Sequence, residues 1–178
     1  MKQSLSELLA KLDTVPGPVP LNLLSEELAK TSIVLSDVQR NISFGEQTYR
    51  RNLLHEGPAY HALVLCWRSG QRSPIHDHSG SSCAVYVLQG KATETLFAQT
   101  AEGLIYATST QEQGHGEVIG SYDGDIHQIS NLQPEGQDLI TLHLYSPPLL
   151  KMNLYSLTDR TVATFYDPIE FFSEGAGI

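Results

Sequence analysis

The segment GQRSPIHDHSGSSC, residues 70–83 of a chain of 178 residues, contains the most informative pattern in this sequence. Its two histidines, His76 and His78, are one residue apart, and on an extended segment alternate side chains point to the same face. Two imidazoles side by side supply half of a metal site. A third histidine, His127, lies far along the chain in GDIHQISN, residues 124–131. We expect the three imidazoles to meet at one metal ion.

Composition narrows the class of protein. A length of 178 residues with 40% hydrophobic residues fits one domain with a substantial core. The net charge of −9 argues against a nucleic-acid partner, because phosphate binding needs clustered Lys and Arg. No apolar run approaches the ~20 residues that span a bilayer, and the N-terminus has no basic-then-apolar signal pattern. We therefore expect a cytoplasmic, monomeric protein with no membrane partner.

The chain divides into a helical N-terminal layer, residues 1–45, and a barrel, residues 46–178, of one domain covering 1–178. Ser4 can cap a first helix, whose leucines Leu5, Leu8, Leu9 and Leu12 have helical spacing. A Pro-rich break at 16–20 ends it, and residues 25–30 suggest a second helix. From Tyr60 onward, turn residues separate short β-rich runs at 60–67, 84–89, 91–98, 103–107, 117–119, 126–130, 139–145, 153–157 and 161–166. Many short strands at regular spacing are typical of a sandwich or barrel.

The two histidine stretches resemble the paired motifs of the cupin superfamily. The first motif has the form G-x5-H-x-H-x3,4-E-x6-G, and its positions here are Gly70, His76, His78, Cys83 and Gly90. The second has the form G-x5-P-x-G-x2-H-x3-N, and its positions here are Gly116, Tyr122, Gly124, His127 and Asn131. The departures are Cys83 for the usual Glu and Tyr122 for the usual Pro. The fold class we expect is all-β: a small jelly-roll cupin barrel with the helical layer added.

Cys83 in the glutamate position changes the charge of the expected metal site. Two histidines and a carboxylate would give a site with one net positive charge around a divalent ion. Three neutral imidazoles leave the ion with both of its positive charges. Imidazole ligands suit Fe(II) and keep coordination positions open. Such a site favours an anionic substrate, for example a thiolate, together with O2.

A longer part of the chain, roughly residues 49–166, is similar to cysteine dioxygenase, a cupin that oxidises thiols. The segments that carry this resemblance are LCW at 65–67, IHDH at 75–78, Cys83, LQG at 88–90, ETLF at 94–97 and HLYSPP at 143–148. The resemblance implies a mononuclear iron enzyme that adds both atoms of O2 to a thiol sulfur and forms a sulfinic acid. It assigns Fe(2+) ligation to His76, His78 and His127.

The same resemblance assigns catalytic positions to Cys83, His143 and Tyr145. Cys83 and Tyr145 match the pair that forms a thioether cross-link in some members, and the Tyr145 phenol would face the bound oxygen and sulfur. His143 precedes Tyr145 by two residues on one strand face, so it can orient the phenol. Thr141 continues this polar stripe, while Ile140, Leu142 and Leu144 face the other way. A polar stripe on an apolar strand predicts a polar cavity inside the barrel.

Substrate selection is expected to depend on Arg51. In cysteine-specific members an arginine followed by Asn-Leu holds the substrate carboxylate, and Arg51 has that place here. A planar guanidinium pairs with a carboxylate through two hydrogen bonds. Arg50 is the alternative, but on a strand it would point the opposite way, whereas Tyr49 shares the face of Arg51.

The rest of the expected substrate-binding set is Tyr49, Trp67 and Met152. Met152 and Ala163 stand where related enzymes carry Cys and Met, and Thr141 stands for Ser. The other histidines, His55, His61 and His115, have no motif partners, and we interpret them as surface or packing residues. Asp77 lies between two expected ligands and should point away from the metal. Cys66, in an apolar run, is interpreted as a buried core residue.

The sequence thus predicts an Fe(II)-dependent dioxygenase that converts L-cysteine to cysteine sulfinic acid, with a small thiol and O2 as its partners. One alternative is a dioxygenase of another small thiol acid, such as 3-mercaptopropionate or mercaptosuccinate. The other is a cupin module that binds metal without catalysis, against which Arg51, His143 and Tyr145 argue.

Overall fold

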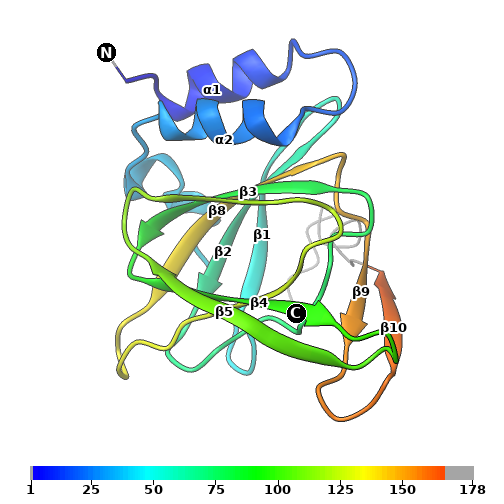
Figure 1. The fold of residues 1–178 in the computed structure, drawn as a ribbon. Coiled ribbons are helices and arrows are strands. Elements are labelled where there is room, and N and C mark those ends of the chain that lie inside the picture. The colour runs from blue at the N-terminus through cyan, green and yellow to red at the C-terminus, as the bar shows by residue number, and fades with distance from the viewer. Residues whose placement is uncertain (1, 167–178) are drawn as a thin grey trace.

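The protein is described by a computed structural model that covers residues 2–166. Within this range ten strands form antiparallel sheets, and two helices pack outside them (Figure 1). The strands are β1 (Arg50–Glu56), β2 (His61–Trp67), β3 (Ser82–Gln89), β4 (Ala92–Gln99), β5 (Ile105–Gln113), β6 (Val118–Ser121), β7 (Ile126–Ser130), β8 (Leu139–Ser146), β9 (Lys151–Tyr155) and β10 (Val162–Tyr166). The largest sheet has the order β1-β2-β8-β3-β6, opposite a sheet of order β5-β4-β7, and β9 pairs with β10. The all-β barrel expected from the sequence is confirmed.

The first helix, α1 (Leu5–Leu12), begins where the sequence predicts. The Ser4 hydroxyl accepts a hydrogen bond from the Glu7 amide, and the Glu7 carboxylate accepts one from the Ser4 amide at 2.7 Å. This capping box satisfies backbone donors that the first helical turn leaves free. The leucines at 5, 8 and 12 form the buried face of the helix.

The second helix, α2 (Leu21–Ala29), starts four residues before the expected position at Ser25. Pro20 is its N-cap residue, in an extended conformation that suits the residue before a helix. Leu21, Leu24 and Leu28 face the protein interior. Two short 3-10 helices, η1 (Leu35–Asp37) and η2 (Gln39–Asn41), then lead to β1.

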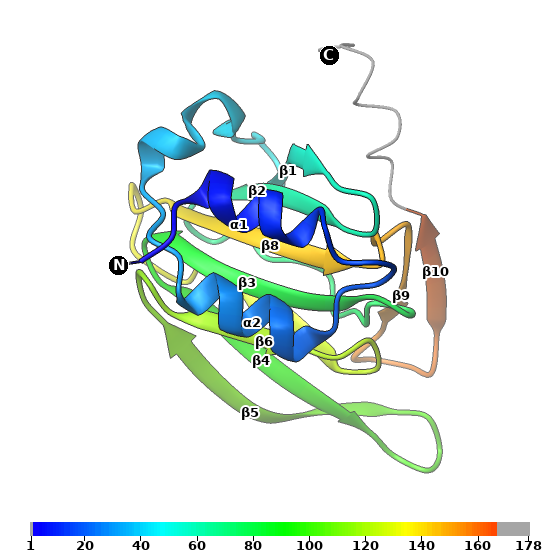
Figure 2. The same ribbon diagram turned by 90° about the horizontal axis from the view of Figure 1, so that it is seen from above.

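The central strands β2 and β8 of the five-stranded sheet are buried on both faces, and β2 accordingly has a continuous apolar run from Ala62 to Trp67. The two helices cover the outer face of this sheet (Figure 2). On that side the helical leucines pack against Ala62, Val64, Ile140, Leu142 and Leu144. The inner face carries the alternate residues of the same strands, including Leu63, Leu65 and Tyr145. The period-2 pattern of β8 therefore separates an apolar outer face from the polar Thr141, His143 and Tyr145, as predicted.

The two largest differences from the expected strands lie at sheet edges. β1 lies before the first run expected at Tyr60, and β5 extends to Gln113 where the sequence suggests a strand ending at Ala107. Both are edge strands. Most residues of β5 are exposed and those of β1 are half-buried, so neither has a strong apolar pattern.

Gly90 shows why a motif glycine is needed at the turn after β3. Its φ is +80°, and a Cβ placed there would lie 2.8 Å from the carbonyl oxygen of Asp138. Only glycine adopts this conformation and allows the close backbone approach without strain. Of the described part of the chain, no helix is long and apolar enough to span a membrane.

Candidate metal centre and adjoining cavity

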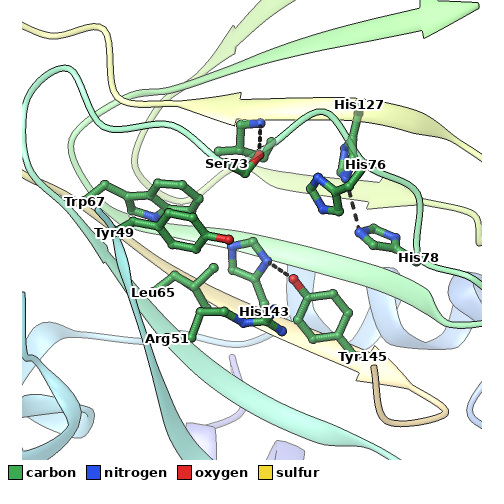
Figure 3. Close-up of a pocket in the computed structure, with 11 residues that line it drawn as sticks. Tyr49, Arg51, Leu65, Trp67, Ser73, His76, His78, His127, His143 and Tyr145 are labelled. Carbon is green, nitrogen blue, oxygen red and sulfur yellow. Dashed lines mark hydrogen bonds between the residues drawn. The ribbon is translucent and has the colours of Figure 1, made fainter. Parts of the chain in front are cut away.

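Three histidine side chains converge inside the barrel (Figure 3). His76 and His78 come from the segment between β2 and β3, and His127 comes from β7. The ring centroids of His76 and His127 are 4.7 Å apart, and that of His78 lies 5.3 Å and 4.8 Å from them. One nitrogen from each ring lies within 4.8 Å of the other two. The three imidazoles therefore meet, as the H-x-H spacing and the second motif predict.

The backbone holds two of these residues together. The His76 amide donates to the carbonyl oxygen of His127, and the His127 amide donates to that of His76, both at 2.9 Å. This reciprocal pair joins the loop that carries the H-x-H sequence to β7. Residues that are distant in the sequence thus have a fixed relative orientation.

Ring hydrogen bonds decide which nitrogens face the centre of the cluster. Nδ1 of His76 lies 3.0 Å from the carbonyl oxygen of Pro74, and Nδ1 of His127 lies 2.8 Å from a carboxylate oxygen of Glu94. The Nε2 atoms of His127 and His78 are 3.1 Å apart. The Nδ1 atoms of His76 and His127 thus contact other groups. In both rings Nε2 is the nitrogen that remains to bind a metal ion at the centre of the cluster.

The rings of His76 and His78 are in the neutral form, which binds metals. Burial lowers the pKa of His76 to about 3 and the pKa of His78 well below its usual value. Neutral imidazole is the ligating form of histidine. A set of three imidazole nitrogens suits a divalent first-row metal such as iron or zinc, and no carboxylate belongs to this cluster of the described residues.

Cys83 and Tyr145 lie beside the histidines. The two residues are directly paired across β3 and β8, so their side chains share the inner face of the sheet. The Cys83 sulfur is 3.8 Å from Nδ1 of His143, and burial raises the pKa of its thiol. The Tyr145 ring lies 5.5 Å from the ring of His78 and nearly perpendicular to it.

A chain of hydrogen bonds leads along the inner face to Tyr145. The Trp67 indole donates to Thr141 Oγ1 at 3.0 Å, and that oxygen lies 2.9 Å from Nε2 of His143. Nδ1 of His143 lies 3.0 Å from the Tyr145 hydroxyl. Burial lowers the pKa of His143 well below its usual value, so its ring is neutral and has one donor and one acceptor nitrogen. The chain fixes the position of the phenol.

Arg51 and Tyr49 complete the cavity on the side of β1. The Arg51 guanidinium carbon lies 5.5 Å from the centre of the Tyr145 ring. Tyr49 stacks on Trp67 with 4.1 Å between ring centroids and 12° between planes. Arg50 is exposed, and its guanidinium reaches the Ser43 hydroxyl at 3.1 Å, away from the cavity. The residues that line the cavity are Tyr49, Arg51, Leu65, Trp67, Ser73, His76, His78, His127, Ile129, His143 and Tyr145.

Met152 is the one expected substrate-binding residue that the structure does not bring to the cavity wall. It is buried in the apolar cluster that also contains Cys83, Tyr145 and Leu149. Its side chain therefore belongs to the apolar core and does not line the cavity. Ala163 is exposed on β10. The position of Met152 depends on how β9 pairs and packs against the rest of the barrel, which no local sequence pattern reveals.

Asp77 points away from the metal cluster, as expected, and binds β9. One of its oxygens accepts hydrogen bonds from the amides of Ser79 and Asn153, at 3.0 and 3.2 Å. The other accepts from the Asn153 side chain at 3.0 Å and from the Tyr155 hydroxyl at 2.7 Å. Burial and this hydrogen bond raise the pKa of Tyr155 to about 12. Asp77 thus fixes the loop that carries His76 and His78.

The remaining histidines lie outside the cavity. Nε2 of His55 contacts Asp13 at 2.9 Å, and Nδ1 of His115 lies 2.8 Å from the carbonyl oxygen of Leu88. His61 is buried at the start of β2. Sequence reasoning assigned no function to Glu94, whose buried carboxylate contacts His127. The signal that could have revealed Glu94 is its position in the sequence. It lies on the same strand face as the apolar residues Ala92 and Leu96, where a charged side chain is unexpected.

The solved structures that share this fold include the following two. A protein with a double-stranded β-helix domain from Klebsiella pneumoniae subsp. pneumoniae aligns with 72% of this chain and 87% of its own, at a TM-score of 0.52 and 15% identity. The TT1209 protein from Thermus thermophilus aligns with 63% and 95%, at a TM-score of 0.53 and 15% identity. Together with the histidine motifs, this architecture defines a cupin.

The chain belongs to the cysteine dioxygenase type I family, whose model matches residues 31–158. Cysteine dioxygenase type 1 of Homo sapiens is 35% identical over 109 residues, which are 59% of this chain and 54% of the human protein. The Danio rerio protein of the same name is 34% identical over 117 residues, 63% of this chain and 58% of its own. The chain spans about half the length of the curated relatives it matches.

Proposed function

We propose that this protein is an Fe(II)-dependent dioxygenase that oxidises L-cysteine to cysteine sulfinic acid. The reaction joins one thiol and one O2 molecule, R–SH + O2 → R–SO2H, so the sulfur is oxidised, O2 is reduced and both oxygen atoms stay in the product. The observation that carries the proposal is that the three-histidine cluster and Arg51 line one small cavity. Family membership supports the same chemistry.

His76, His78 and His127 would hold the iron through Nε2. Their neutral nitrogen donors fit Fe(II), and three ligands leave coordination positions free. Iron bound there would bring O2 and the substrate sulfur together at one centre. Confining both reactants to one site replaces a bimolecular encounter by a directed attack.

Arg51 would select the substrate by its carboxylate. The guanidinium lies across the cavity from the histidines and next to the Tyr145 ring, where it can form two parallel hydrogen bonds to a carboxylate. A thiol that carries a carboxylate is then held with its sulfur toward the histidines. A thiol without a carboxylate lacks this contact.

The Tyr145 hydroxyl would donate a hydrogen bond to the reacting sulfur and oxygen atoms. His143 holds this hydroxyl at 3.0 Å, and Thr141 and Trp67 hold His143. The fixed phenol needs no reorganisation when charge develops near it. These side chains also fill the inner face of the sheet, which limits water around the reacting atoms.

Cys83 and Tyr145 would become joined by a thioether bond during turnover. The Cys83 sulfur bonds to the ring carbon beside the phenol carbon, and the S–H and the C–H bonds break. The two protons and two electrons released pass to O2, giving hydrogen peroxide. Their direct pairing across β3 and β8 supports this reaction.

The position of Arg51 in the cavity also suits a second class of substrate. Arg51 would hold the carboxylate that 3-mercaptopropionate and mercaptosuccinate share with cysteine. A non-catalytic metal-binding module is disfavoured because such a module has no need of the hydrogen-bonded set that ends at Tyr145.

An oxygen-uptake assay of the Fe(II)-loaded protein against cysteine, cysteamine, 3-mercaptopropionate and mercaptosuccinate tests the proposal. Mass spectrometry should find sulfinic acid with both oxygens from labelled O2, and cysteine should give the highest kcat/KM. A higher kcat/KM for another thiol acid would show that this acid is the substrate, and the proposed type of reaction would stay the same. No uptake with any thiol by iron-loaded protein would overturn the proposal. The cytoplasmic location and the monomeric state stay predictions.

A further inference from the structure

Glu94 is a buried carboxylate directly behind one of the metal-binding histidines. It lies on β4, with 2% of its side chain exposed, and its Oε1 is 2.8 Å from Nδ1 of His127. The other oxygen, Oε2, accepts a hydrogen bond from the Gln111 side chain on β5 at 3.2 Å. A carboxylate buried so completely is costly unless it is paired, so its position needs an explanation.

The three histidines differ in what supports them. Nδ1 of His127 faces a carboxylate, and Nδ1 of His76 faces the carbonyl oxygen of Pro74. Nδ1 of His78 is buried with no hydrogen-bond partner among residues 2–166. A carboxylate on the far nitrogen fixes the tautomer and raises the electron density of the ligating nitrogen. His127 therefore has the strongest support of the three ligands.

The net charge of the proposed metal site also points to a role for Glu94. The position at which other cupins carry a ligating glutamate is occupied here by Cys83, whose thiol burial keeps protonated by raising its pKa. Three neutral imidazoles bring no charge to compensate a divalent ion. Glu94 lies eleven residues after Cys83 and places one negative charge a single imidazole ring away from the cluster centre.

We propose that Glu94 is the charge-compensating and positioning residue of the metal site, acting through His127. The carboxylate that a cupin usually supplies as a direct ligand is replaced by one behind a histidine. The negative charge is retained near the metal, and the coordination position that a glutamate would occupy stays open for substrate or O2. This inference rests on the proposed metal site and adds a residue that the proposed reaction does not name.

Glu94→Gln is the variant that tests the charge. It keeps the size of the side chain and an oxygen that can accept from His127, while Gln111 can turn its own amide to face the new one. Glu112→Gln is the matched control, because Glu112 lies on the neighbouring strand, is exposed and pairs with Lys91 at 2.9 Å. Both variants remove one negative charge, but only Glu94 contacts a metal-binding histidine.

The measurement is the affinity of the folded apo-protein for Co(II), followed by its visible absorption in competition with a chelator, and for Fe(II) under anaerobic conditions. We expect Glu94→Gln to bind both ions roughly 10- to 100-fold more weakly than wild type. Glu112→Gln should bind them as wild type does. Gln111→Val, which removes only the hydrogen bond to Oε2, should give a smaller loss of metal affinity. It provides a second measurement if Glu94→Gln folds poorly.

The outcomes separate the possible explanations. If Glu94→Gln lowers the melting temperature of the apo-protein but leaves its affinity for Co(II) and Fe(II) unchanged, the contact between Glu94 and His127 is merely structural. That result would overturn the proposal. Equal losses in Glu94→Gln and Glu112→Gln would overturn it as well, because the effect would then be long-range charge alone. A wild-type protein that binds neither ion would overturn the proposed metal site itself.

Discussion

Cys83 and Tyr145 are directly opposed residues on the neighbouring strands β3 and β8. They are 62 positions apart in the sequence, and both side chains point into the barrel beside the histidine cluster. Directly paired residues in an antiparallel sheet have their Cβ atoms about 5 Å apart, which is close enough for one covalent bond between thiol and ring after a small rotation.

The first prediction is a thioether between Cys83 and Tyr145. After turnover with Fe(II), O2 and cysteine, peptide mass spectrometry should find the two peptides joined with the loss of two hydrogen atoms. The Cys83→Ser variant should give none of this product, and Cys66→Ser should give as much as wild type, because Cys66 faces the helical layer. Only unlinked peptides after prolonged turnover would exclude the bond.

The second prediction concerns the metal ligands. His127→Ala should lose most bound iron and activity, because two remaining imidazoles cannot hold the ion against exchange with water. Iron content per folded protein, measured after gel filtration, checks this. His115→Ala should retain iron, since His115 lies away from the cluster against Leu88. Full iron occupancy of the His127 variant would disprove the assignment.

The third prediction concerns Arg51 and its neighbour. Arg51→Ala should raise the KM for cysteine by roughly 10- to 150-fold, which corresponds to the loss of about 1.5–3 kcal/mol from a charged hydrogen bond. Arg50→Ala is the matched control and should change KM little, because Arg50 is exposed and contacts Ser43. Wild-type discrimination against cysteamine should largely disappear in the Arg51 variant. An equal effect of the two substitutions would contradict this assignment.

The fourth prediction is a pH-dependent contribution of Glu27 to stability. Its buried carboxylate accepts hydrogen bonds from Lys11 at 2.7 Å and Lys30 at 2.9 Å, which lower its pKa from 4.5 to about 2. A carboxyl group whose pKa is lower in the folded state stabilises the protein above its unfolded-state pKa and loses this effect as the pH falls toward the folded value.

Glu27→Gln should therefore lower the free energy of unfolding by about 1–3 kcal/mol near neutral pH. The difference from wild type should shrink as the pH falls from about 4.5 to about 2. Urea unfolding across this range measures it. Glu26→Gln, which changes an exposed residue 3.8 Å from Lys30, should have little effect at any pH. A constant difference between wild type and Glu27→Gln would show that the charge is not responsible.

Features of this protein that depend on short spacings can be predicted from its amino-acid sequence. The H-x-H pair, the glycine positions of the two motifs and the alternation of Thr141, His143 and Tyr145 each follow from the period of an extended chain. The start of α1 follows from Ser4 and Glu7, which form their capping box within four residues. The edge strands β1 and β5 could not be seen as clearly, because the half-buried residues of β1 and the exposed residues of β5 do not alternate with buried ones.

Tertiary structure alone decided what depends on the pairing of distant segments. Glu94 reaches His127 only because β4 pairs with β7 in one register, and a shift of one residue would turn the carboxylate to the outer face. The same kind of long-range packing placed Met152 in the buried apolar cluster rather than on the cavity wall. Local patterns fix which face a side chain occupies along its own strand, whereas sheet register and layer packing fix which side chains it meets there.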